Sequence, residues 1–284
     1  MENGKIPVES IESWISSQGY PLEMEVHQKF VNTNFITGLS NHYKDFETEK
    51  SREIDVTATL VSAYSKKYIF RVTLCIECKY SKDKPWVIFS GQKNNPVPYI
   101  LSRFIQSEYT YHLIDFIEDG AAINTNEILR EKYIGHSIVQ ALKGKGENPD
   151  DNAYTACMSA FKASIYIADV YSKKKINRVM QSVLAIPMVV LDGQLFDCHL
   201  NLENKSEVQE IEFGIVEWKY HNPLNASPYI YVVTKKYLEV FVGKLNQFVL
   251  DLTSIREEHV SALNQIAQDA LDEAEQESMD NPLI

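Results

Sequence analysis

Two neighbouring segments with alternating apolar and polar residues stand out in the hydrophobic pattern of this chain. Residues 52–60 place Ile54, Val56, Ala58 and Leu60 at every second position, and residues 68–80 do the same with Phe70, Val72, Leu74, Ile76, Cys78 and Tyr80. Because side chains alternate between the two faces of a strand, each segment is predicted to be a strand with one apolar face. Ser65-Lys66-Lys67 lies between them and suits a hairpin turn. If the two apolar faces coincide, Asp55 lies on the same side of the sheet as Glu77 and Lys79.

The rest of the pattern predicts helices and strands that alternate along the chain. Helical spacing of apolar residues predicts helices at residues 8–18, 21–32, 99–116, 126–142, 152–171, 235–250 and 254–277. Further strands are predicted at residues 35–42, 182–191, 194–200, 210–220 and 229–233, with Asp192-Gly193 as the turn of a hairpin. The apolar positions of the first helix predict that it packs on the body. These elements indicate an α/β fold.

Composition places the chain among globular proteins with a sizeable core. It has 284 residues, of which 44% are hydrophobic, and a formal net charge of −11. No run of about eighteen apolar residues occurs, so we expect no membrane span. The first residues show no basic segment followed by an apolar one, so no secretory signal is expected. With only four cysteines, these features favour reduced thiols and a cytoplasmic setting.

The negative charge is concentrated at one end of the chain. Residues 251–284 contain nine acidic residues and one arginine, so the remainder is nearly neutral. Basic stretches at residues 66–67, 79–84 and 173–178 could face phosphate, although each is also typical of an exposed turn. The acidic C-terminal helix could pack on the body or mediate homo-oligomerisation or binding of a protein partner.

The polar residues shared by the two neighbouring strands have a plain chemical use. Asp55 and Glu77 supply the carboxylate oxygens that Mg²⁺ prefers, and the backbone carbonyl of Cys78 could add a ligand. Mg²⁺ lowers the pKa of a bound water and neutralises charge on a phosphate. Lys79 could orient or deprotonate an attacking water and stabilise the phosphorane.

Asp55, followed by Glu77-Cys78-Lys79 at the end of an apolar strand, resembles the signature of the PD-(D/E)XK nuclease superfamily. The resemblance covers roughly residues 20–80, and the C-terminal half only by element order. It implies a restriction-endonuclease-like mixed sheet flanked by helices, with a helix ahead of three strands. A glutamate of that helix often joins the metal site, which implies Glu23, with Glu25 as the substitute. One departure from the signature is that Ile54, rather than proline, precedes Asp55.

The resemblance further implies a Mg²⁺- or Mn²⁺-dependent endonuclease that acts on DNA, in restriction, repair or phage defence. We expect the nuclease core to comprise residues 1–80 and 151–250, separated by a helical insertion at residues 81–150. The acidic C-terminal helix then occupies residues 251–284. If the helix at residues 152–171 follows the E-x-K strand in space, Tyr154 and Lys162 could reach the metal site.

Two other interpretations of the same residues stay open. Glu77 and Lys79 could form a same-face ion pair on a solvated strand, which contributes little to stability. The chain could also be a catalytically silent module that keeps the fold and binds nucleic acid or another protein. Other chemistry is less favoured by the sequence. Cys75 and Cys78 are expected on opposite faces of their strand, which disfavours a zinc or redox site, and no glycine-rich phosphate loop is present.

Overall fold

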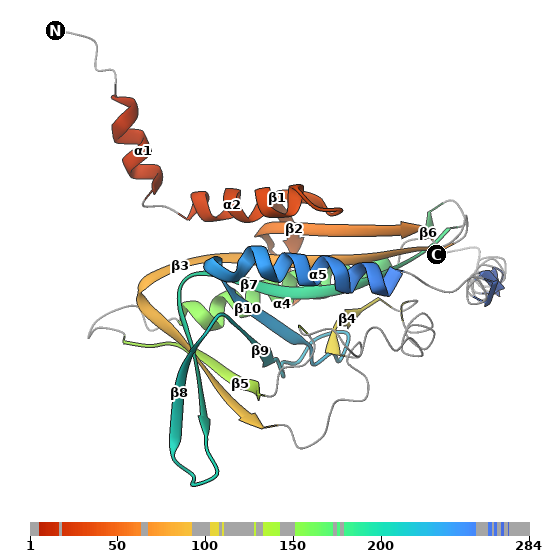
Figure 1. Ribbon diagram of the computed structural model, residues 1–284. Helices are drawn as coiled ribbons and strands as arrows, with labels where there is room; N and C mark the ends of the chain where they lie inside the picture. Colours follow the sequence, from red (N-terminus) through yellow and green to blue (C-terminus); the bar gives the residue numbers. More distant parts are fainter. Residues whose placement is uncertain are drawn as a thin grey trace.

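The computed structural model describes most of the chain, in separate ranges. These are residues 6–16, 19–63, 68–92, 103–107, 110, 128, 133–142, 151–172, 175–176, 179–253, 261–262, 264–265, 268–269 and 272. The architecture is a large mixed β-sheet with helices on both faces (Figure 1). The α/β class predicted from the alternation of elements is therefore confirmed.

Five strands form the part of the sheet that carries the candidate site. They are β1 (Ile36–Lys44), β2 (Ser51–Ala63), β3 (Tyr68–Gln92), β7 (Val179–Leu200) and β10 (Tyr229–Thr234). The first three are consecutive and antiparallel, whereas β7 runs parallel to β3 and β10 runs parallel to β7. The chain therefore passes through a helix and a longer crossover before β7 lies beside β3, as parallel neighbours require.

The remaining strands extend this sheet, two of them along the first part of β7 and three around the second halves of β3 and β7. They are β4 (Ile105–Gln106), β5 (Tyr133–Gln140), β6 (Lys175–Ile176), β8 (Ser206–Ile211) and β9 (Phe213–Glu217). β5 pairs with the second half of β3, and β9 connects β5 to β10, so the pairings close a ring of β3, β5, β9, β10 and β7. The hairpin of β7 and β8 projects away from the body (Figure 1).

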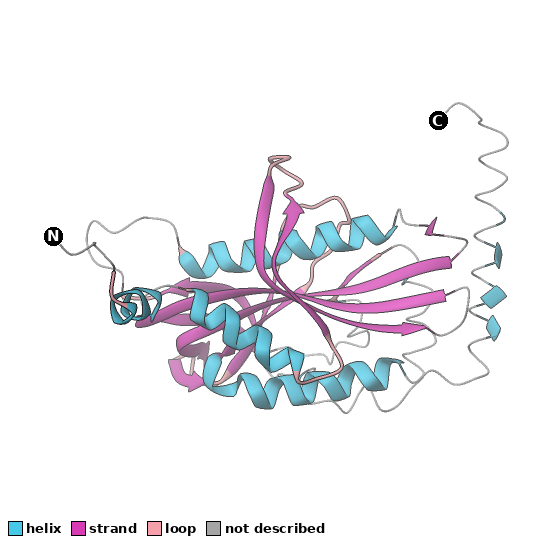
Figure 2. Cartoon of the chain, turned by 90° about the horizontal axis from the view of Figure 1, so that it is seen from above, coloured by secondary structure: helices cyan, strands magenta, loops and turns pink. Residues whose placement is uncertain are grey.

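Two layers of helices bury the two faces of the sheet. On one face, α2 (Tyr20–Val31) and α5 (Leu238–Thr253) pack in one core cluster with Val72, Leu74 and Ile76 of β3. On the other face, α4 (Asn152–Ser172) packs against β7, β3 and β5 with its small and aromatic residues. Figure 2 shows these helices on either side of the strands. Alternate side chains of β3 therefore pack in the two different cores, as the alternating sequence pattern predicts.

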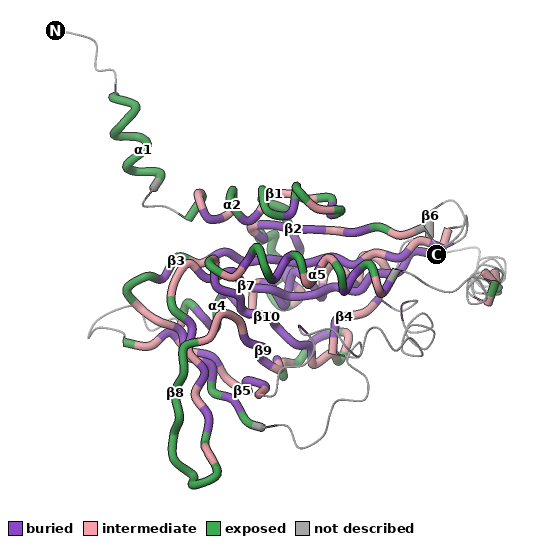
Figure 3. Tube along the Cα trace, in the orientation of Figure 1, coloured by how far each residue is buried: buried purple, intermediate pink, exposed green. Residues whose placement is uncertain are grey.

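The first helix, α1 (Val8–Ser16), does not pack as its apolar positions predict. Its described residues are exposed, including Ile11 at 43% and Trp14 at 56%, and Figure 3 shows the helix extended from the body. The prediction of a packed helix is therefore wrong for this segment. Its pattern is amphipathic, but within the described ranges no element lies against most of its apolar side.

The hairpin expected at Asp192-Gly193 is not formed. Instead β7 continues through these residues to Leu200, and the partner of its last part is β8. The reason lies on β3, where the parallel register is interrupted between Ser81 and Trp86, so both strands bend together. A Cβ at Gly193 would lie 2.5 Å from the carbonyl oxygen of Ser81. Glycine is required here for close approach of two strands, and not for a turn.

Gly193→Ala is therefore expected to destabilise the protein, because the added methyl group must push β7 away from β3. Overpacking of this kind typically costs about 1–3 kcal/mol. Urea unfolding followed by circular dichroism would measure the change in the free energy of unfolding. Gly243→Ala in α5 is the matched control, because a Cβ there meets nothing within 4 Å. Equal stability of the two variants would contradict this account of the bend.

The region expected as a helical insertion contains strands wherever the structure describes several consecutive residues. Residues 81–92 continue β3, and residues 133–140 form β5, although a helix was predicted over residues 126–142. The buried apolar residues Ile134 and Ile138 are four positions apart, a spacing that a helix and a strand share, so the pattern could not distinguish the two. Most of the helix predicted at 99–116 lies outside the described residues, and its described part includes β4.

The end of the chain is described only in part. The helix predicted at 235–250 is confirmed as a short 3-10 turn, η4 (Lys235–Tyr237), followed by α5. Most of the acidic helix predicted at 254–277 lies outside the described residues. Among the helices that the structure describes, none is both long enough and apolar enough to cross a membrane.

Candidate metal-binding site

Asp55 lies on β2 at the point where this strand leaves β3. The paired residues of β2 and β3 run up to Val56 opposite Ile76 and stop there. Beyond that pair, a side chain replaces the backbone as hydrogen-bond acceptor. Oδ2 of Asp55 accepts a hydrogen bond of 2.7 Å from the backbone N–H of Cys78. Asp55 is thereby held against the Glu77-Cys78-Lys79 segment, as the predicted register requires.

The alternation of β2 breaks at the same place. Val56, Ala58 and Leu60 belong to the core under α2, but Ile54 packs with Cys75 and Ala163 on the side of α4. The single apolar face predicted for 54–60 is therefore wrong at Ile54. Opposite Asp55, the β1 residue Ser40 falls between paired neighbours and has a positive φ of 52°. This local irregularity reorients β2 around the aspartate.

Glu77 and Lys79 form an ion pair on β3. The Nζ of Lys79 lies 2.8 Å from Oε2 of Glu77, and the glutamate is only 4% exposed. A solvated edge is therefore not the setting of this glutamate. Because the ion pair involves a buried carboxylate, removing either partner leaves the other charge poorly compensated.

The helix ahead of the strands brings one glutamate towards these residues. Glu23 of α2 is close enough that Asp55 and Lys79 both alter its pKa. Glu25, the substitute that the resemblance allows, points elsewhere and forms an ion pair of 2.6 Å with Lys235. The structure therefore favours Glu23 over Glu25 as the acidic neighbour of Asp55.

Burial is the main cause of the shifted carboxyl pKa values at the site, and neighbouring acidic groups add to it. Burial raises the pKa of Glu77 to about 7, and Asp55 and Glu23 add to the rise, whereas Lys79 opposes it. Burial also raises the pKa values of Asp55 and Glu23. Burial alone would lower the pKa of Lys79, but Glu77 and Asp55 hold it above its ordinary value, so the amine is protonated near neutral pH.

The two carboxylates of Asp55 and Glu77 suit a hard divalent cation that needs few protein ligands. Across the described ranges, no three His, Cys, Asp or Glu side chains form a group that could hold a metal ion. Mg²⁺ commonly binds through one or two carboxylates and keeps several waters. Asp55 and Glu77 meet this smaller requirement, since a bound cation would stabilise the charged carboxylates that burial disfavours.

The raised pKa of Glu77 predicts how the metal-free protein responds to pH. A carboxylate with a folded pKa of about 7 and an ordinary value of 4.5 contributes stability below pH 4.5, and this is lost as pH rises through 7. Each unit of such a shift corresponds to about 1.4 kcal/mol. In EDTA, the wild type should therefore lose more stability between pH 5.5 and 8 than Glu77→Gln does. The same pH slope of unfolding free energy in both proteins would contradict the assignment.

A second polar cluster, which the sequence did not reveal, lies between the β1–β2 turn and α4. Asp45 is 1% exposed and accepts hydrogen bonds from Arg52 Nε at 2.8 Å and from Lys162 Nζ at 3.0 Å. Lys162 also contacts Glu47, which in turn accepts a hydrogen bond from Tyr220. Asp45 additionally accepts hydrogen bonds from the N–H groups of Glu47 and Thr48, an Asx-turn pattern that a sequence can suggest.

This cluster corrects the expectation that Lys162 and Tyr154 reach the metal site. Lys162 is engaged by Asp45 and Glu47, and the ring of Tyr154 lies 5.2 Å from that of Trp218. Tyr43, which no motif indicated, also belongs to this region, because burial raises its pKa and Glu77 adds to the rise. Its position at the end of β1 could be predicted, but its proximity to Glu77 depends on the strand register.

The structure describes the predicted basic stretches only in part, and it describes both cysteines of the Cys75–Cys78 segment. Residues 66–67, 173–174 and 178 of the basic stretches lie outside the described residues. Lys82 is exposed and lies over the ring of Tyr80 at 5.3 Å. Cys75 and Cys78 pack in different clusters, which confirms that they lie on opposite faces of β3.

Comparison with known proteins identified no relative, so the function of this site is inferred from its geometry. No protein-family model, curated protein or solved structure matched the chain.

Proposed function

We propose that this protein is a metal-dependent nuclease that hydrolyses DNA phosphodiester bonds, with Asp55 and Glu77 as ligands of Mg²⁺ or Mn²⁺. The observation that carries the proposal is the hydrogen bond of Asp55 to the Cys78 N–H, which brings the acid of β2 beside the Glu77–Lys79 pair of β3. The backbone carbonyl of Cys78 is the third donor that we assign, and Glu23 supports the site from α2.

Each residue has a role that follows from its surroundings. A cation bound to the two carboxylates would activate water and neutralise phosphate charge. Lys79 stays protonated because of its acidic neighbours, so we assign it to orienting the attacking water and stabilising charge on the phosphate, rather than to removing a proton. Burial of Glu77 strengthens these electrostatic interactions because the site is shielded from bulk water.

The order of elements also supports the proposal. A helix, α2, precedes the three antiparallel strands β1, β2 and β3, which is the order that the resemblance to PD-(D/E)XK nucleases implies. Helix α4 and the parallel strand β7 then follow, so the candidate residues lie near the middle of a covered sheet. An isolated ion pair on an exposed edge would not account for a glutamate buried between two helical layers.

The proposal is tested with the full chain and four substrates: supercoiled plasmid, linear duplex DNA, single-stranded DNA and RNA. Each is incubated with Mg²⁺, Mn²⁺ or EDTA, and Asp55→Asn serves as the inactive variant. We expect cleavage of at least one DNA substrate that requires the cation and is lost in the variant. Cleavage that persists in EDTA or in Asp55→Asn contradicts the proposal. Tight DNA binding without cleavage would instead favour the silent module.

A further inference from the structure

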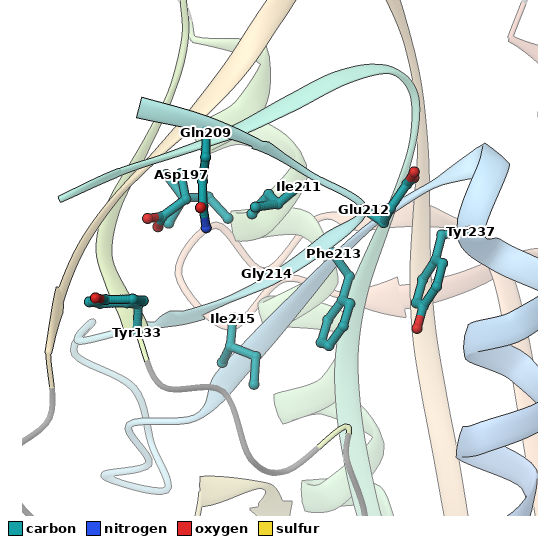
Figure 4. Close-up of a pocket in the computed structure, with 10 residues that line it drawn as sticks. Tyr133, Asp197, Gln209, Ile211, Glu212, Phe213, Gly214, Ile215 and Tyr237 are labelled. Atoms are coloured by element: carbon teal, nitrogen blue, oxygen red, sulfur yellow. The ribbon is translucent and has the colours of Figure 1, made fainter. Parts of the chain in front are cut away.

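A second candidate binding site lies far from the acidic cluster, where β5, β7, β8, β9 and η4 meet. The pocket has a volume of about 350 Å³, and Figure 4 shows nine of its side chains or backbone positions by name. Along β7, Asp197 of this pocket is eight residues from Val189, the partner of Glu77. At about 3.3 Å per residue, the two sites are roughly 26 Å apart along the strand. The pocket shares no residue with the candidate metal site.

The polar wall of the pocket is built on two adjacent strands, β7 and β8. Asp197 of β7 is paired with Ile88 of β3 on one side and with Gln209 of β8 on the other. Paired residues of neighbouring strands lie side by side on one face of a sheet. Figure 4 accordingly shows Asp197 and Gln209 next to each other at one side of the pocket. A carboxylate and an amide therefore line the same wall.

Asp197 is a buried acid with a single hydrogen-bond partner among the described residues. Its Oδ2 lies 2.7 Å from Nδ1 of His199, and the two residues are 5% and 7% exposed. The ring of Tyr133 stacks on that of His199 at 4.1 Å, which fixes the imidazole. A carboxylate accepts several hydrogen bonds, and burial without partners is costly. Oδ1 of Asp197 and the remaining acceptor capacity of Oδ2 are therefore available to donors that enter the pocket.

The other lining residues restrict the chemistry of that donor. Ile88, Ile211 and Ile215 make an apolar wall, and the stacked rings of Phe213 and Tyr237 border it at a centroid distance of 5.6 Å. None of the described residues that line the pocket is a lysine or an arginine, and the acidic Glu212 is held by Lys236. The pocket thus disfavours a phosphate group and suits a flat ring with an N–H edge.

We infer that this pocket binds a guanine base, whose Watson–Crick edge complements the pair of Asp197 and Gln209. The base offers two adjacent N–H donors, N1–H and the N2 amino group, to a carboxylate, and one acceptor, O6, to an amide N–H. Asp197 accepts the two donors, and the Gln209 amide donates to O6. The base is carried by a free nucleoside or by a nucleic-acid strand, and both sources present the same edge.

The inference is tested by titrating the full chain with nucleosides in an isothermal calorimeter. Guanosine should bind at least tenfold more tightly than inosine, which lacks the N2 amino group, and than adenosine, which lacks N1–H. Asp197→Asn should remove this preference. Because that change affects a buried residue, Gln209→Ala, which alters an exposed residue, serves as a second variant that should weaken guanosine binding about tenfold. Glu207→Gln, an exposed β8 residue outside the pocket lining, should bind as the wild type does.

Further titrations identify whether the base belongs to a free nucleoside or to a nucleic-acid strand. Equal affinity for guanosine and its 5′-monophosphate supports a free ligand, and tighter binding of an oligonucleotide with a single dG supports a strand. The inference is overturned if all four nucleosides bind equally, if guanosine does not bind at millimolar concentration, or if spermidine binds and guanosine does not. Lys79→Ala should still bind guanosine, so failure of this inference is distinguishable from failure of the nuclease proposal.

Discussion

Lys79→Ala is expected to lower the rate of metal-dependent DNA cleavage by about 10²–10³-fold, the range typical for loss of one positioned donor that stabilises developing charge. The amine lies 2.8 Å from Glu77 and is kept protonated by its acidic neighbours. Without it, the water that attacks the phosphate loses its orientation, and negative charge on the phosphate loses a fixed partner. Initial cleavage rates at saturating cation measure the effect.

Two further variants separate the catalytic role of Lys79 from a structural one. Lys82→Ala removes an exposed lysine from the same strand and should cleave at the wild-type rate. Lys79→Arg keeps the charge but changes its shape and reach, so it should recover only part of the activity. Wild-type cleavage by a folded Lys79→Ala protein would contradict the role assigned to this amine.

Asp45→Asn is expected to destabilise the protein by about 3–5 kcal/mol, because it leaves a buried lysine without its main counter-charge. Asp45 accepts hydrogen bonds from Lys162, Arg52 and two backbone N–H groups. Although burial raises the pKa of Asp45, Lys162 and these donors bring it down to about 2. The contact ties the β1–β2 turn to α4, so its loss should loosen both.

Chemical unfolding at pH 7 measures this effect on the free energy of unfolding. Glu49→Gln is the matched control, because Glu49 lies in the same turn and pairs with Lys44 at the surface. A surface pair of this kind contributes less than about 1 kcal/mol. Similar stability losses in the two variants would show that the buried cluster does not hold the turn on α4.

The strands that carry the candidate site could be predicted because their burial alternates. Val72, Leu74 and Ile76 fill one core while Cys75 and Glu77 face the other, as a period of two requires. The same rule misplaced Ile54, since the irregularity at Ser40 on the neighbouring strand reverses the local orientation of β2. Propensity within one segment contains no information about a residue with positive φ in another.

Contacts between distant segments were harder to predict. Gly193 suggested a turn, and only the approach of Ser81 from β3 shows why glycine is required in a continuous strand. One partner of Asp45, Lys162, lies 117 residues away along the chain, so the burial of Asp45 could not be predicted from the turn sequence. The Asp197–His199 pair was also missed, because its alternation resembles any half-buried strand.

The claim on which this account depends is that Asp55 and Glu77 hold one divalent cation between them. Titration of Mn²⁺ into the metal-free protein, followed by electron paramagnetic resonance, tests it directly. We predict one site per chain whose affinity falls at least tenfold in Asp55→Asn and in Glu77→Gln, and is unchanged in Glu25→Gln, whose carboxylate pairs with Lys235. Equal Mn²⁺ affinity in all four proteins, or no Mn²⁺ binding by the wild type, would contradict it.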